Sequence, residues 1–328
     1  MNKFFTTALA GTLVCATGFA SETEWPELDR ELEALSSSLS TLDGGPSLDG
    51  WAIIAYDNNS DTDMGDFALR SVRLNASGSN GDYGYFVSLD AAGLDSDGDS
   101  NVSLVDAYAT FGIGGISATL GAFRAPTLTS ALIDRNQTFF IDRSMLGAAG
   151  SARDAGLQLS GDMGTVGWWL AVMDGFDGGG DEYEITGRVA VDLMGDGANG
   201  SNEGAYGAGD GTCLSAALAF QDDGGDDSSS MAVEAYFTSG PFSASVEAVD
   251  NDDADTTATA ITVTYAFTGD WELGARMEDD DAGTETLTIG VNKYVSGHDV
   301  KWQVNMQSID DDVLGDTDTI SVGLAVGF

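Results

Sequence analysis

The stretch ITVTYAFTGDWELGARME, residues 261–278, decides the fold that we predict for this chain. Apolar residues occupy every second position of 261–267 and, after a three-residue turn, of 271–277. The positions between them are small or polar and include Glu272 and Arg276. Because successive side chains of a strand point to opposite faces, the stretch predicts two antiparallel strands with one apolar and one polar face.

The same alternation returns from Trp51 to the last residue and predicts sixteen strands. An even number of strands, each near about 9–11 residues long, is typical of a transmembrane β-barrel. No run of 18 apolar residues follows residue 20, which excludes a membrane-spanning helix. The expected strands lie near 51–57, 67–77, 82–92, 102–113, 115–124, 152–161, 164–174, 184–193, 212–221, 230–239, 241–249, 257–268, 270–278, 284–294, 297–307 and 318–328.

The lengths of the connections favour a barrel over a soluble β-sandwich or β-solenoid, in which strands also alternate. From the fourth strand onward, tight links such as 113–115 and 296–298 alternate with longer, Asp-rich ones. This is the pattern of an outer-membrane barrel whose two chain ends lie on the periplasmic side. One link, 195–211, is long where a short turn is expected. We therefore predict an all-β fold, a 16-stranded antiparallel transmembrane β-barrel over 47–328, in the bacterial outer membrane.

The N-terminal part is predicted to contain a leader and a helix. Lys3, the apolar stretch 4–14 and the small residues 18–20 are typical of a secretory signal peptide over 1–20. Between residues 21 and 46, apolar residues are spaced alternately three and four apart, which predicts a short periplasmic helix. This helix either joins subunits as a parallel coiled coil or lies on its own domain. The apolar positions are Trp25, Leu28, Leu32, Leu35, Leu39 and Leu42.

The charge of the chain is strongly acidic and unevenly placed. Its 54 acidic and 12 Lys and Arg side chains give a formal net charge of −42, which excludes nucleic acid as a partner because phosphate binding needs a basic surface. The acids serve either solubility, including in salty surroundings, or an electrostatic collar at a pore mouth. Seven predicted long loops hold 28 acids and no Lys, Arg or His: 57–66, 95–101, 174–183, 222–227, 250–255, 278–283 and 308–318.

The sequence offers little that is typical of an enzyme or a metal site. His298 is the only histidine and lies in a predicted tight turn, and no His/Cys cluster has the spacing of a zinc site. The segment 95–106 resembles a calcium loop, but Ser100 occupies the position where such a loop needs Gly. We therefore predict no catalytic residues, no bound metal and no cofactor.

The connection 125–150 differs from the others, because its twenty-six residues contain no expected strand. Loops of this length are usually functional, and one that folds into a wide barrel narrows the lumen. We predict that this loop forms a constriction, where paired opposite charges set a transverse field across permeating ions. The alternative is that its arginines pin the loop to the barrel wall. The charged residues of the expected constriction are Arg124, Asp134, Arg135, Asp142, Arg143, Arg153 and Asp154.

The polar face of the strands is expected to point into the barrel, because the apolar face must meet lipid. This assignment rests on parity alone, so a register error of one residue would invert it. The expected pore-lining residues are Arg73, Asp106, Tyr108, Glu247, Glu272, Arg276, Lys301 and Gln303.

The segment GAFRAPTLTSALIDRNQTFFIDRSMLGAAGSARDAGLQLSG, residues 121–161, resembles the phosphate-selective porin O and P family. In that family a strand ending Gly-x-Phe-Lys/Arg-x-Pro leads into the constriction loop and then into Gly-Arg-Asp-x-Gly-Leu/Val-Gln-Leu-Ser-Gly. Residues 121–126 match the first part and 153–161 the second, with Ser151-Ala152 in place of the leading Gly. The stretches 69–78, 106–108 and 187–190 and the terminal Phe328 also fit.

The resemblance implies a sixteen-stranded barrel, typically a trimer, through which small hydrophilic solutes diffuse. It does not imply phosphate selectivity, which depends on an arginine ladder and a lysine-rich vestibule, whereas only 11 basic residues follow Lys3. We expect a general diffusion porin with weak cation preference; the alternatives are an anion- or phosphate-selective porin and a non-conducting barrel that tethers the envelope. The expected partners are outer-membrane lipid, including lipopolysaccharide, two further copies of the chain, and small ions and solutes.

Overall fold

The structure is a computed structural model that describes residues 45–60, 64–91, 102–175, 183–196, 201–224, 229–252 and 254–328. The predicted signal peptide over 1–20 lies outside the described residues, as does the predicted helix over 21–46 except for its last two residues. The Asp-rich part of the calcium-like segment 95–106 is also outside them, although Asp106 is described.

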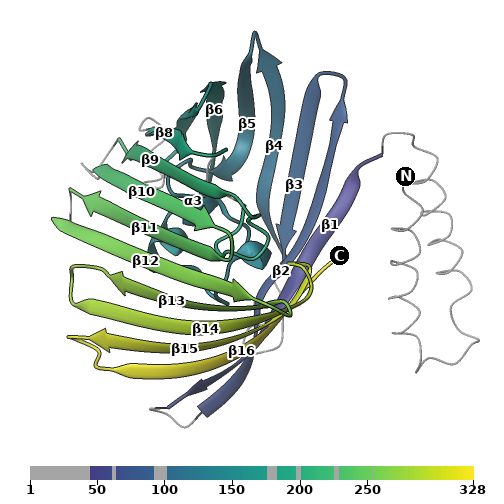
Figure 1. Ribbon diagram of the computed structural model, residues 1–328. Coiled ribbons are helices and arrows are strands. Elements are labelled where there is room, and N and C mark those ends of the chain that lie inside the picture. The colour runs from purple at the N-terminus through teal and green to yellow at the C-terminus, as the bar shows by residue number, and fades with distance from the viewer. Residues whose placement is uncertain are drawn as a thin grey trace, which may run out of the picture. The chain divides into compact units, whose positions relative to one another are not determined.

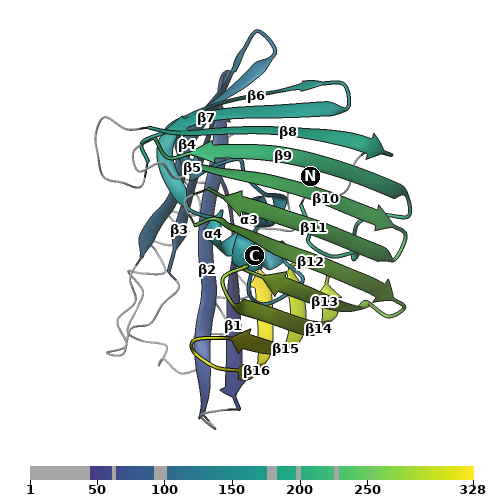
Figure 2. The ribbon, with the colours of Figure 1, turned by 90° about the vertical axis from the view of Figure 1, so that its left-hand side faces the viewer.

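Sixteen strands form one closed antiparallel barrel, in which each strand pairs with its neighbours in sequence and the first pairs with the last (Figures 1 and 2). This confirms the predicted fold class and the number of strands. The strands are β1 (Ser47–Asn59), β2 (Met64–Asn80), β3 (Tyr83–Asp90), β4 (Ser103–Ile113), β5 (Ile116–Arg124), β6 (Arg153–Met163), β7 (Val166–Met173), β8 (Glu184–Met194), β9 (Thr212–Asp222), β10 (Ser229–Ser239), β11 (Phe242–Asn251), β12 (Thr256–Phe267), β13 (Trp271–Asp279), β14 (Thr284–Ser296), β15 (Val300–Asp311) and β16 (Thr317–Gly327).

The two faces of the wall have opposite chemistry. On β12, Ile261 and Tyr265 are 49% and 51% exposed on the outside, whereas Thr262 and Thr264 are 5% and 2% exposed on the inside. An apolar outer surface of this kind is stable only against lipid, and a closed barrel leaves no unpaired strand edge there. No helix within the described ranges is long and apolar enough to cross a membrane.

Aromatic side chains gather on the outside near the short-turn end of the barrel. Such residues prefer the boundary between lipid and water, because one end of the ring system is apolar and the other polar. The exposed members of this set, beside the turns after β10 and β12 and at the C-terminus, are Phe242, Tyr265, Phe267, Trp271 and Phe328.

The connection between β5 and β6 lies inside the barrel (Figures 1 and 2). It contains two short helices, α3 (Thr129–Leu132) and α4 (Met145–Ala149), and a single 3₁₀ turn, η1 (Arg135–Gln137). Its apolar residues Leu128, Ala131 and Leu146 pack against alanines of the wall. Those alanines, on β9, β10 and β12, are Ala219, Ala232 and Ala260.

A second apolar contact depends on glycines of the wall. Phe139, Phe140 and Ile141 of the loop are at most 1% exposed. A Cβ added to Gly274 of β13 would lie 2.6 Å from the Phe139 ring, and one added to Gly323 of β16 would lie 3.0 Å from Ile141. The loop therefore seats closely on this side of the barrel because the wall carries no side chain at these positions.

The described part of the long link between β8 and β9, residues 201–211, enters the lumen from the opposite end. Its Ala205 donates its backbone N–H to Glu272 at 2.6 Å, and the Tyr206 ring stacks on Tyr294 with centroids 3.7 Å apart. Glu203 contacts the inward-folded loop, where it accepts from the Phe139 N–H at 2.8 Å. These residues therefore lie in the lumen against both the loop and the wall.

Candidate functional site: a one-sided lumen

Carboxylates of the barrel wall hold the inward-folded loop by its backbone. Thr129 donates to Glu234 of β10 from its N–H at 2.8 Å and from its hydroxyl at 2.7 Å. The Ser130 N–H donates to Glu247 of β11 at 3.2 Å, and the Met145 N–H reaches Glu278 of β13. Free backbone donors at the first turn of a helix favour such anionic partners.

Arg276 of β13 makes several contacts at once, with carboxylates, with carbonyls of the loop and with an aromatic ring. It is 1% exposed, pairs with Glu278 at 2.8 Å and Glu203 at 3.5 Å, and lies 4.5 Å from the Phe140 ring centroid. Its two terminal nitrogens donate to the carbonyls of Asp142 and Arg143 at 3.2 and 3.1 Å. One buried guanidinium thus joins the wall, the loop and the link 195–211.

Three further wall side chains hold the middle of the loop. Asn292 of β14 and Gln303 of β15 donate to the Phe139 carbonyl at 2.8 and 2.7 Å, and Lys301 donates to the Thr138 carbonyl. These contacts continue the row of loop anchors across the last strands of the barrel. The loop is therefore fixed at both its backbone donors and its backbone acceptors.

Five of the expected pore-lining residues point into the barrel but do not border open space. They lie on the inward face, where the loop and residues 201–211 cover them, and parity says nothing of what packs over a face. Their side chains anchor those two segments. The five, each at most 3% exposed, are Glu247, Glu272, Arg276, Lys301 and Gln303.

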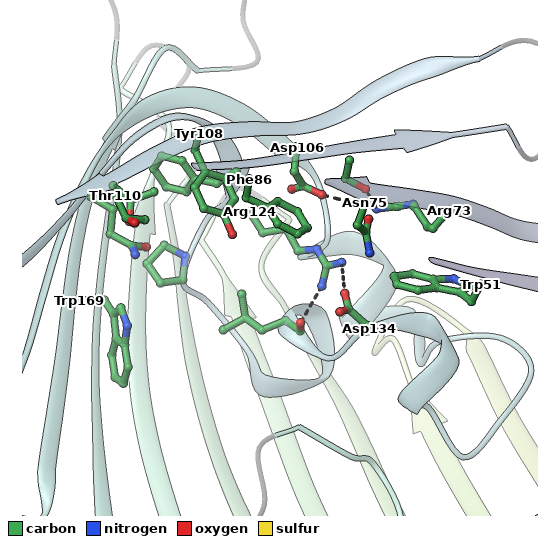
Figure 3. A pocket seen from close by; sticks show the side chains of 16 residues that line it. Trp51, Arg73, Asn75, Phe86, Asp106, Tyr108, Thr110, Arg124, Asp134 and Trp169 are labelled. Atoms are coloured by element: carbon green, nitrogen blue, oxygen red, sulfur yellow. Dashed lines mark hydrogen bonds and ion pairs between the residues drawn. The ribbon is translucent and has the colours of Figure 1, made fainter. Parts of the chain in front are cut away.

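An open space of about 440 Å³ lies on the other side, between the loop and strands β1 to β7 (Figure 3). Three of the expected pore-lining residues, Arg73, Asp106 and Tyr108, border it, and Arg124 and Asp134 reach it from the expected constriction. The complete lining is Trp51, Arg73, Asn75, Phe86, Ser88, Asp106, Tyr108, Thr110, Thr119, Phe123, Arg124, Pro126, Leu132, Asp134, Gln158 and Trp169.

The charges that border this space are balanced. Arg73 lies 2.8 Å from Asp90 and 3.4 Å from Asp106, and Asp106 also accepts from Arg153 at 3.2 Å. Facing them, Arg124 pairs with Asp134 at 3.1 Å (Figure 3). Two arginines and two aspartates line the space directly, so its formal charge is zero despite the acidic chain.

Two arginines of the expected constriction also cap helix α3. Arg124 donates to the carbonyls of Ala131 and Leu132 at 2.9 and 2.7 Å, and Arg143 donates to the carbonyls of Ser130 and Ile133. Cations at a helix C-terminus satisfy its last carbonyls and its dipole. Burial, together with the nearby Arg124 and other arginines, lowers the pKa of Arg143 to about 9.

The remaining members of the expected constriction lie away from the open space. Arg135 and Asp142 pair within the loop at 2.7 Å, and Asp142 also lies 3.6 Å from Arg70. Asp154 accepts from the backbone N–H of Ala155 and Gly175 at 2.7 and 2.6 Å, so it fixes the chain around β6. The structure thus gives several of these charges an anchoring contact.

Four aromatic residues of the lining have no counterpart among the expected site residues: Trp51, Phe86, Phe123 and Trp169. The sequence contained a signal for Phe86. Its neighbours Tyr85 and Val87 are apolar and form the outer face of the strand, so alternation points Phe86 inward. The expected site residues were chosen for charged or polar groups, and this choice passed over these rings. The same alternation predicts that the anchors Glu234 and Glu278 point inward. Glu203 lies in a connection without alternation, so no such signal exists for it.

Comparisons with known proteins identify the fold. No protein-family model and no curated protein matches the sequence. A mutant of the porin of Rhodobacter blastica matches with a TM-score of 0.59 at 18% identity, over 86% of this chain and 100% of that chain. An anion-selective porin from Comamonas acidovorans matches with a TM-score of 0.60 at 14% identity, over 87% of this chain and 100% of that chain.

A loop-deletion mutant of OmpT, an outer membrane protein of Vibrio cholerae, matches with a TM-score of 0.59 at 12% identity, over 87% of this chain and 99% of that chain. Identities this low show the fold alone, and they do not single out the phosphate-selective O and P family. The chain has the fold of the bacterial outer-membrane porins, and its apolar outer face fits a lipid environment.

Proposed function

We propose that this protein is a porin through which ions and small hydrophilic solutes diffuse passively, along the space between the inward-folded loop and strands β1 to β7. One observation carries the proposal: the loop and residues 201–211 cover inward side chains of strands β11 to β15, whereas an open space remains between the loop and strands β1 to β7. A lumen filled from both sides would instead favour a closed structural barrel. The path is narrowed where Arg124 and Asp134 face Asp106 and Arg73.

We propose a weak preference for cations. The connections that follow odd-numbered strands all leave from one end of the barrel, and between the strand bounds seven of them hold 19 acids and no Lys or Arg. These charges raise the cation concentration at that mouth, but only within about 8 Å in physiological salt. The balanced lining of the space adds no strong preference of its own, so the selectivity is expected to be small.

An anion preference is the second candidate, because four arginines meet around the open space and the loop beside it. Burial, with smaller contributions from nearby arginines, lowers the pKa of one of them, Arg143, to about 9. Their donors, however, already contact carbonyls and carboxylates, so they resemble loop anchors more than an anion-binding ladder. The four are Arg124, Arg135, Arg143 and Arg153.

A homotrimer and a tethering role of 21–46 remain proposals that rest on the sequence. Replacing Leu32 and Leu35 by Lys would weaken subunit association if the coiled coil joins the subunits. Unchanged association in sedimentation velocity would remove that role.

Recording from the purified full-length protein in a planar lipid bilayer tests the proposed function. Steady, uniform conductance steps are expected, and their absence would favour the non-conducting barrel. Under a KCl gradient, the reversal potential is expected to indicate a small excess of cation permeability. A reversal potential of the opposite sign would select the anion-preferring alternative.

A further inference from the structure

We propose that the open side of the lumen binds neutral polyhydroxylated solutes, specifically pyranose sugars, during their passage. This inference names the solute class of the channel proposed above and rests on that function. It is carried by the arrangement of aromatic rings, neutral hydrogen-bonding groups and already paired charges around one space.

A patch of aromatic rings covers one wall of the space. Phe86 of β3 and Tyr108 of β4 stack with centroids 5.3 Å apart at 27°, and Phe123 of β5 meets Tyr108 edge-on at 6.4 Å. Phe86, Tyr108 and Trp169 of β7 are partly exposed to the space. Partly exposed aromatic rings in the lumen offer apolar surface, which suits the C–H face of a pyranose ring. The Arg188 guanidinium already lies over the Trp169 ring, 5.9 Å from its centroid.

Neutral hydrogen-bonding groups lie one register step from these rings, toward the short-turn end. In the sheet, Tyr108 pairs with Phe86 and Gly121, whereas Thr110 pairs with Thr119. Thr119 in turn pairs with Gln158 of β6, so two hydroxyls and one amide form a row across three strands. All three side chains border the space, and each can both donate and accept, as sugar hydroxyls require.

The space beside the aromatic patch is large enough for a small solute. Its volume of about 440 Å³ falls in the range of small-molecule sites.

The charges favour a neutral solute over an anion. Arg124 donates to three loop carbonyls and Asp134, and Arg73 donates to Asp90, Ser88 and Asp106. A carboxylate or phosphate would need to displace these contacts. In these ion pairs the carboxylate oxygens can still accept hydrogen bonds and the guanidinium N–H groups can still donate them. A sugar hydroxyl can therefore bind beside the ion pair without separating it.

Current block by sugars tests the proposal in the full-length protein. Maltose added to a single channel in a planar bilayer is expected to reduce the current in a saturable, concentration-dependent way. Trp169→Ala and Phe86→Ala are expected to raise the half-blocking concentration about tenfold, which corresponds to the loss of one aromatic contact. The matched control is Tyr265→Ala, an exposed aromatic on the lipid side of β12, which is expected to leave the block unchanged.

A second readout separates this inference from the proposed function. Isothermal titration of maltose into the detergent-solubilised protein is expected to show saturable binding that Trp169→Leu weakens. A channel that conducts but neither binds maltose nor is blocked by it overturns the inference and leaves the porin intact. Block by benzoate without block by maltose also overturns it, in favour of aromatic anions. A protein that binds maltose without conducting overturns the porin and keeps the site.

Discussion

The two halves of the barrel wall consist of the same kind of alternating strand, but their inward side chains have different roles. From β8 to β16 most inward side chains are small or bind the loop and the link 195–211, and the spaces left between the loop and strands β9 to β11 are smaller, at about 340 and 200 Å³. From β1 to β7 the inward side chains border open space. The difference teaches that an inward-facing charge in a barrel is part of a pore only where nothing packs on it.

Charge illustrates the contrast most clearly. Glu247 is 3% exposed and accepts from the Ser130 N–H and the Tyr236 hydroxyl, so its charge serves the loop. Asp134 has the same formal charge, but its side chain is 51% exposed beside the open space. Solutes therefore experience the second carboxylate far more than the first, because the loop separates the first from the open space.

Arg276→Met is expected to have the largest effect on stability. The substitution leaves Glu203 and Glu278 without their shared cation and removes the donors of two loop carbonyls. Breaking one partner of a buried ion pair costs about 3–5 kcal/mol. The midpoint of urea unfolding in detergent measures this loss of stability. Arg70→Met, which removes partly exposed pairs with Asp57 and with Asp142 of the loop, is the control and is expected to cost about 0–1 kcal/mol.

Gly274→Ala is expected to disturb the seat of the loop. The new Cβ would lie 2.6 Å from the Phe139 ring, and overpacking of this kind costs about 1–3 kcal/mol. The loop can yield only toward the open side, so single-channel conductance is expected to fall. Gly112→Ala is the matched control on β4, where a Cβ meets nothing within 4 Å. Equal conductance in both variants would refute the proposed packing.

Asp134→Asn is expected to shift selectivity with little loss of stability. It raises the formal charge of the lining by one, which favours anions by about two- to fourfold in permeability ratio. Glu247→Gln replaces a carboxyl group that lies under the loop, so its reversal potential is expected to match that of the unmodified protein. A similar shift in both variants would mean that the covered half also faces permeating ions.

The smallest effect is expected from salt. Exposed acidic loops act over about 10 Å at 0.1 M ionic strength and about 3 Å at 1 M. The cation preference is therefore expected to decline as KCl is raised at a constant concentration ratio across the bilayer. A preference that does not change with salt would locate the selectivity at the narrow part of the lumen instead of at its mouth.

The barrel could be predicted from the sequence because alternation and connection length are local signals. Residues 261–267 show them plainly, and the structure confirms both strands of that hairpin. The inward orientation of Glu247 and Arg276 followed from the same parity. These features need no knowledge of which distant segments meet.

The side on which the loop packs could not be predicted in this way. It depends on the absence of side chains at Gly274 and Gly323, and a glycine inside a strand can equally mark a bulge or a sharp bend. The triplet 139–141 was a usable sign, since three apolar residues in a charged loop must be buried somewhere. Its partners lie more than 130 residues away along the chain, beyond the reach of local periodicity.

The most direct test of the one-sided lumen compares two threonines in a Cys213→Ser background, which removes the free thiol. Thr110→Cys places a thiol on the open wall, and Thr262→Cys places one on the covered wall. In single-channel recordings with a charged methanethiosulfonate reagent, the first variant is expected to lose conductance in a discrete step and the second to stay unchanged. Modification that blocks the Thr262→Cys channel and spares the Thr110→Cys channel would contradict the account.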